Sequence, residues 1–181
     1  MDPHAPFLLR LSTVEEGESH REMMGSPEEL AFQGDGFEPE GPISFRARIY
    51  RIGDRMEIRG PVRTKVRQTC GRCLEPVVSE VEAEVRVFAE PPDSRDPRER
   101  EEVREDDLGI VYHDGQSVDL TDEVRQVLLV EVPWHPTCRE DCRGLCPRCG
   151  ANRNGDGCAC TEDPVDPRWR ALLDLREKAE E

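Results

Sequence analysis

The chain has 181 residues, of which 35% are hydrophobic and 36% are charged, and its formal net charge at pH 7 is −15. Because domains cluster near ~100 to 150 residues, this length and apolar content predict one compact domain with a modest core and a small appendage. The net charge by itself argues against a protein that binds nucleic acid unaided.

Residues 1–42 are acidic and rich in turn-forming residues. Phe7, Leu9 and Leu11 alternate with other residues and predict a short strand, whereas the run from Glu15 to Pro42 predicts an irregular acidic segment outside the core. No basic leader with a long apolar run begins the chain, and no segment approaches the ~20 apolar residues of a membrane span. We therefore expect a cytoplasmic protein, in which thiols stay reduced.

Residues 43–133 carry the patterns of a sheet and a helix. Apolar and polar residues alternate in SFRARIY, RMEIRG, VRTKVRQ and SEVEAEVRVFAE, with a turn at Gly53 and Asp54 between the first two segments. The inward residues predicted for the first and last segments are Phe45, Ala47, Ile49, Val81, Ala83, Val85 and Val87. Four strands joined by short turns predict an antiparallel sheet with one buried face.

An acidic loop at residues 90–107 is expected to separate this sheet from a helix that ends at Pro133. Asp119 or Thr121 can cap this helix, and Leu120, Val124, Val127 and Leu128 share one face. Residues 134–181 are then a cysteine-rich segment followed by a C-terminal helix. The predicted fold is α+β, a mainly antiparallel sheet with a packed helix and a zinc-ribbon-like appendage.

Eight cysteines, mostly in closely spaced pairs, give the strongest chemical signal. Structural zinc takes four thiolates at ~2.3 Å, and two thiolates in a C-x-x-C turn reach one metal without distortion. We predict two structural zinc ions. The local set is Cys146, Cys149, Cys158 and Cys160, and the set that joins distant segments is Cys70, Cys73, Cys138 and Cys142.

Other readings of the cysteines are a CGRC redox pair, which normally opens a helix rather than following a strand, and a disulfide framework, which needs an oxidising compartment. Catalytic zinc usually keeps an open position, whereas these thiolates divide into two closed sites. The four histidines stand singly, and the usual hydrolytic and phosphate-binding motifs are missing. We expect no enzyme and no small-molecule substrate.

Residues 43–72 carry 9 basic and 2 acidic side chains, a local excess of +7 in an acidic protein. They could line a polar sheet face that meets RNA phosphates, although the expected lack of exposed aromatic residues on these strands argues against base stacking. The alternative is that they pair with the acidic strand EVEAEV. The RNA-binding candidates are Arg46, Arg48, Arg63, Lys65, Arg67 and Arg72.

The segments CGRCLEPV, VDLTDEVRQVLLVEVPWHPTC, CRGLCPRCGANRN, CAC and DPRWRAL, in this order, closely resemble the YceD family of large ribosomal RNA subunit accumulation proteins. The resemblance covers roughly residues 43–181, and Arg153 replaces an apolar residue expected between the two asparagines. Some relatives lack the C-terminal cluster while they keep the first cysteine pair.

The resemblance implies a non-enzymatic factor, in bacteria or plastids, that large-subunit ribosomal RNA needs in order to accumulate. Its expected partner is that RNA or a basic ribosomal protein, which acidic segments would suit. The competing functional classes are a zinc-ribbon module that binds nucleic acid in transcription and a thiol redox protein.

Overall fold

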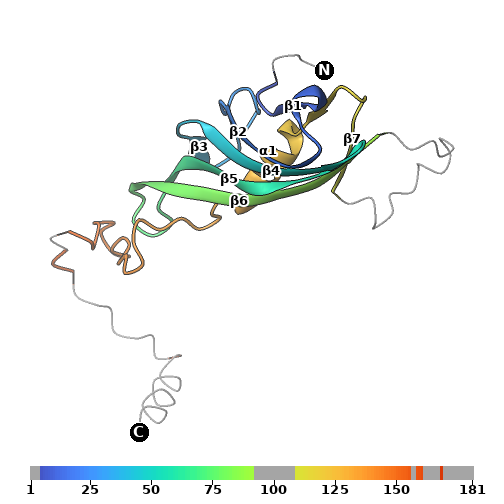
Figure 1. Ribbon diagram of the computed structural model, residues 1–181. Helices are drawn as coiled ribbons and strands as arrows, with labels where there is room; N and C mark the ends of the chain where they lie inside the picture. Colours follow the sequence, from blue (N-terminus) through green and yellow to red (C-terminus); the bar gives the residue numbers. More distant parts are fainter. Residues whose placement is uncertain (1–4, 92–108, 156–157, 161–167, 169–181) are drawn as a thin grey trace, which may run out of the picture.

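The computed structural model describes residues 5–91, 109–155, 158–160 and 168 (Figure 1). The expected C-terminal helix and residues 92–107 of the expected acidic loop lie outside the described residues. The elements are β1 (Leu8–Arg10), a 3-10 helix (Leu11–Thr13), β2 (Gly17–Gly25), β3 (Phe37–Pro39), β4 (Ile43–Ile52), β5 (Arg55–Thr69), β6 (Pro76–Glu90), β7 (Ile110–Tyr112), β8 (Ser117–Asp119) and α1 (Thr121–Glu131).

One twisted sheet dominates the described fold. Its strands follow the order β2, β4, β5, β6, β7, and β3 pairs with the C-terminal end of β5. All pairs in this sheet are antiparallel except that of β6 and β7, and β1 and β8 form a separate antiparallel pair. The predicted α+β fold with a mainly antiparallel sheet is confirmed.

The core lies on one face of the sheet, under α1. The residues predicted to face inward on β4 and β6 are all buried, and Val124 and Leu128 of α1 are buried in the same apolar cluster. The Asp119 carboxylate accepts hydrogen bonds from the backbone N–H and the hydroxyl of Thr121, at 3.0 and 2.6 Å, at the start of the helix. Among the described residues, no helix is long and apolar enough to cross a membrane.

The expectation of an irregular acidic segment before residue 43 is wrong for residues 17–25. These residues form β2, which pairs with β4 over its full length, and Leu30 and Phe32 beyond it are buried. Because β2 is an edge strand, its inward side chains are only partly buried and include polar residues such as Ser19 and Arg21. The apolar alternation that identifies a strand in the sequence is therefore weak here.

The segments RMEIRG and VRTKVRQ are one continuous strand, β5, rather than the two strands predicted. The alternation of inward and outward side chains continues through Gly60 and Pro61, two residues that usually interrupt strands. Pro61 has no N–H to donate, and no residue pairs with β4 are registered at these two positions, whereas pairing with β6 is unbroken. The unbroken pairing with β6 keeps β5 extended through Gly60 and Pro61, where its pairing with β4 is interrupted.

His113 is buried and ties the β4–β5 turn to the segment between β7 and β8. Its Nε2 lies 2.7 Å from the backbone oxygen of Asp54, and its Nδ1 accepts a hydrogen bond from the N–H of Gly115 at 3.1 Å. These partners require the neutral ring with its proton on Nε2. Its role in the fold is therefore structural.

We predict that Gly60→Ala destabilises the sheet. Gly60 has a φ of 152°, and an added Cβ would lie 2.0 Å from the backbone oxygen of Arg46, so the two strands would have to separate. We expect the free energy of unfolding to fall by about 2 kcal/mol or more in a denaturant titration. Gly155→Ala is the control, because nothing lies within 4 Å of its added Cβ. Equal effects of the two substitutions would contradict the prediction.

Candidate metal centres and a basic sheet face

The eight cysteines form two sets of four, in the pairing predicted from their spacing. Within each set the Sγ atoms all lie within 4.8 Å of one another. We call the first set the sheet-end site, made of Cys70, Cys73, Cys138 and Cys142. The second set is the ribbon site, made of Cys146, Cys149, Cys158 and Cys160. Each set could hold one metal ion.

The sheet-end site joins two distant parts of the chain at the end of the sheet (Figure 1). Cys70 and Cys73 lie in the turn between β5 and β6, whereas Cys138 and Cys142 follow α1. The Sγ of Cys70 lies 3.9 Å from that of Cys142, and the Sγ of Cys73 lies 3.6 Å from that of Cys138. Three of the four cysteines are buried, so this site continues the interior of the protein beyond the sheet.

The two C-x-x-C segments adopt the same turn. The N–H of Leu74 donates to the carbonyl of Cys70 at 3.0 Å, and the N–H of Gly150 donates to that of Cys146 at 2.8 Å. The first cysteine of each turn donates in return to the carbonyl five residues later, again at 2.8 Å. Leu74 and Gly150 both have left-handed backbone, with φ of 62° and 73°. The structure therefore holds two copies of one turn, each of which presents two thiols of a candidate metal site.

Backbone amides stabilise a thiolate at the first cysteine of each turn. The N–H groups of Cys73, Arg72 and Cys138 lower the pKa of Cys70 to about 6, and those of Cys149 and Arg148 lower the pKa of Cys146 to about 6. In contrast, the neighbouring sulfur of Cys73 is the main cause that raises the pKa of Cys138 to about 12. Four thiolates this close repel one another, so a cation is needed to hold them all in the charged form.

The sulfur geometry of the sheet-end site fits a tetrahedral metal. Metal–sulfur bonds of ~2.3 Å in a tetrahedron place the sulfur atoms about 3.8 Å apart. The separations of 3.6 and 3.9 Å at the sheet-end site agree with this value. Because all four donors of each set are thiols, a bound ion would have no open position left for a substrate.

Two side chains outside the cysteine sets hold the sheet-end site in place. The Arg72 guanidinium donates to the backbone oxygens of Glu140 and Cys142, at 3.3 and 3.1 Å. The Asn154 amide donates to the Sγ of Cys142 at 3.2 Å, and this contact lowers the pKa of that thiol. Such partners orient metal ligands and fix their charge. Arg72, which the sequence suggested as an RNA-binding candidate, therefore contacts the segment that carries Cys142.

The other five RNA-binding candidates project from the outer face of the sheet, and each forms an ion pair. Arg63 and Lys65 pair with Glu82 and Glu80 of β6, at 2.8 and 3.5 Å, as the alternative interpretation of the basic strands predicts. The remaining pairs are Arg46 with Glu22 at 3.3 Å, Arg48 with Glu18 at 3.4 Å and Arg67 with Glu40 at 2.6 Å. These pairs are exposed, so each contributes little to stability.

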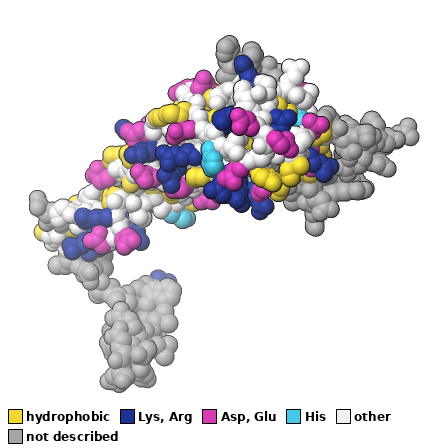
Figure 2. Space-filling model, in the orientation of Figure 1, with side chains coloured by type: hydrophobic (Ala, Val, Ile, Leu, Met, Phe, Trp, Pro, Cys, Tyr) yellow, Lys and Arg dark blue, Asp and Glu magenta, His cyan; other side chains and the backbone are white. Residues whose placement is uncertain are grey.

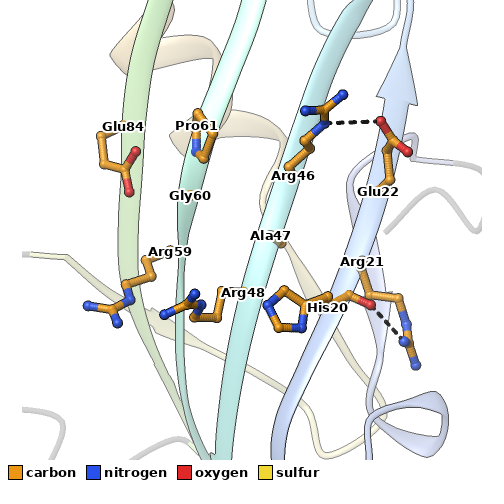
Figure 3. A pocket seen from close by; sticks show the side chains of 10 residues that line it. All are labelled: His20, Arg21, Glu22, Arg46, Ala47, Arg48, Arg59, Gly60, Pro61 and Glu84. Carbon is orange, nitrogen blue, oxygen red and sulfur yellow. Dashed lines mark hydrogen bonds and ion pairs between the residues drawn. The ribbon is translucent and has the colours of Figure 1, made fainter.

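Strand register on the same face reveals a group that the sequence does not show. His20, Arg48, Arg59 and Arg86 are directly opposite one another on β2, β4, β5 and β6. Figure 3 shows the first three side by side on neighbouring strands. His20 and Arg86 were missed because only the pairing of distant strands aligns them. We call these four residues the basic row.

Comparisons with known proteins agree with the resemblance seen in the sequence. The family model of large ribosomal RNA subunit accumulation protein YceD matches residues 58–176, a range that contains all eight cysteines. A Mycobacterium tuberculosis protein described as uncharacterized is 29% identical over 154 residues, which cover 83% of this chain and 70% of the relative. A Mycobacterium leprae protein, also described as uncharacterized, is 30% identical over 135 residues, 74% of this chain and 59% of the relative.

A plant protein is also similar to this chain. The Zea mays large ribosomal RNA subunit accumulation protein YCED homolog 1, chloroplastic, is 26% identical over 156 residues, which cover 69% of this chain and 50% of that protein. No solved structure matches the chain at a significant level.

The paired turns predict opposite effects for two substitutions. Left-handed backbone costs about 1–2 kcal/mol for a residue that has a Cβ. Leu74→Gly removes this cost from the first turn, whereas Gly150→Ala adds it to the second. We expect Leu74→Gly to tighten metal binding at the sheet-end site and Gly150→Ala to weaken it at the ribbon site, each by about fivefold or more. Competition with a chromogenic chelator measures both. Changes of the same sign would refute the shared turn.

The two sites are expected to differ in their effect on the fold. Cys138→Ser breaks the link between the segment after α1 and the β5–β6 turn, so we expect the midpoint of thermal unfolding to fall by about 5 °C or more. Cys158→Ser is the matched control, because its site contains only residues 146–160, and its midpoint should change by less than about 2 °C. Equal shifts would show that neither site specifically supports the sheet.

Proposed function

Because the chain belongs to the YceD family of large ribosomal RNA subunit accumulation proteins, we propose that it is a non-enzymatic factor that supports the accumulation of that RNA. The observation that carries this proposal is the family match across residues 58–176, which includes both cysteine sets and most of the β5–β6 hairpin. In this proposal the protein acts by binding ribosomal RNA during assembly, in the bacterial cytoplasm.

We propose that both cysteine sets hold structural zinc. All-thiolate tetrahedral sites suit zinc, which has no geometric preference of its own and takes up tetrahedral sulfur ligands readily. The sulfur separations at the sheet-end site support this choice. Bound there, zinc would fasten the segment after α1 to the β5–β6 turn and add stability that a small core cannot supply.

A binding role is also supported by the chemistry of the sites. Four thiolates around each ion would close its coordination sphere, so zinc would have no position at which to activate water. The outer sheet face carries a dense set of basic side chains, which Figure 2 shows along the sheet with acidic side chains between them. Such a face suits a partner that bears regularly spaced negative charge, as RNA does.

The proposal is tested by depleting the protein in the organism that makes it. We expect the ratio of large-subunit to small-subunit ribosomal RNA to fall, and expression of the intact chain to restore the ratio. The measurement is quantification of both mature RNAs and of their precursors by northern hybridisation. An unchanged ratio after complete depletion would refute the proposed function.

A further inference from the structure

The three arginines of the basic row place like charges where strand pairing usually avoids them. His20 faces Arg48, Arg48 faces Arg59, and Arg59 faces Arg86, across four neighbouring strands. Like charges at directly opposite positions of a sheet are destabilising. On one side the next pairs are Glu22 with Arg46 and Pro61 with Glu84, and no pairing of β4 with β5 is registered between them. On the other side the next row is Glu18, Tyr50, Glu57 and Phe88. The basic residues therefore face one another across the strands, although β2, β5 and β6 also carry acidic residues.

Arg59, near the middle of the row, has no carboxylate partner among the described residues. The neighbouring arginines are each paired to one side, Arg48 with Glu18 at 3.4 Å and Arg86 with Glu57 at 3.1 Å. Arg59 is exposed on the central strand β5. Its guanidinium is therefore free to bind an anion that reaches the row from solvent.

A hollow of about 620 Å³ lies beside the row, where the ladder between β4 and β5 is interrupted. Its lining includes His20, Arg48 and Arg59, together with Pro61, whose ring is short compared with the neighbouring side chains (Figure 3). Glu84 also lines the hollow, and Arg46 is held there by Glu22. The carboxylates of Glu22 and Glu84 therefore lie beside the row in this hollow.

Two exposed aromatic side chains stand in the row next to the basic row. Tyr50 of β4 and Phe88 of β6 retain 49% and 40% of their accessible surface. The guanidinium carbon of Arg86 lies 5.4 Å from the centre of the Phe88 ring, so the aromatic and basic groups are in contact. The expectation from the sequence that the basic strands of residues 43–72 lack exposed aromatic residues is therefore wrong for Tyr50. Adjacent rows are about 7 Å apart along the strands.

We propose that this face binds a single-stranded segment of RNA, with phosphates along the basic row and bases stacked on Tyr50 and Phe88. A sheet face that combines stacking rings with a basic track fits unpaired nucleotides, whose bases are free to stack. An acidic peptide would use the arginines but would leave the two rings without partners, and a duplex would offer no unstacked bases. The choice of RNA as the class of nucleic acid rests on the proposed function.

The test uses the full metal-loaded chain and a fluorescent single-stranded RNA of roughly 12 nucleotides, followed by anisotropy at several salt concentrations. Arg48→Ala combined with Arg59→Ala should weaken binding about tenfold and reduce the slope of log affinity against log salt by about 1.4. The matched control is Arg63→Ala combined with Lys65→Ala. It removes the same amount of positive charge from the same face, but both residues already form ion pairs with glutamates of β6. We expect this control to weaken binding by less than about threefold.

Tyr50→Ala combined with Phe88→Ala should weaken binding by at least about fivefold and leave the salt slope unchanged, since stacking is worth ~1–3 kcal/mol per base. Circular dichroism of each variant should match that of the unchanged chain. Absence of RNA binding, equal losses in the two charge variants, or equally tight binding to duplex RNA or poly-glutamate would each overturn the proposal.

The same variants separate this inference from the proposed function. If depletion lowers large-subunit RNA and the Arg48→Ala, Arg59→Ala chain restores it fully, the RNA-binding face is refuted and the proposed function stands. If depletion leaves that RNA unchanged while anisotropy shows the expected losses, the proposed function is refuted and the binding face stands.

Discussion

The convergence of four thiols at the end of the sheet is the constraint on which the cysteine-rich segment of this protein depends. The apolar core lies under α1 and ends before the turn between β5 and β6, where Cys70 is fully buried among sulfur atoms rather than hydrocarbon. Beyond that point the described chain has few apolar side chains to bury. Four thiols converge there instead of apolar side chains, and backbone amides are directed at the Cys70 sulfur. When these thiols are ionised, only a bound cation can balance their negative charge.

Much of this arrangement could be predicted because it is encoded locally. Strict alternation identified β4 and β6, and the spacing of the cysteines identified the ribbon site, which left the four cysteines of the sheet-end site as the second set. What the sequence could not show depends on contacts between distant strands. β2 has polar inward side chains and is stabilised by pairing with β4, and β5 passes through Gly60 and Pro61 because β6 supports it. The basic row is likewise a product of register.

The basic residues on the outer face of the sheet form two sets that differ in what they face on the neighbouring strands. Arg63 and Lys65 are neutralised by β6 and belong to the ion-pair pattern of an ordinary exposed sheet. The basic row opposes like charges and leaves Arg59 without an acidic partner in the described chain. A net charge of −15 is compatible with RNA binding when the positive residues are aligned on one face and the acidic ones surround them. Zinc at the sheet end and RNA on the sheet face would then serve separate purposes, stability and recognition.

The most direct test of the central claim is X-ray absorption at the metal edge of the purified chain, with elemental analysis of metal per chain. We expect two zinc ions per chain, each surrounded by four sulfur atoms at ~2.3 Å. Zinc bound by nitrogen or oxygen, or a metal-free chain with Cys70 and Cys73 joined in a disulfide, would contradict the claim that thiolate coordination holds this fold together.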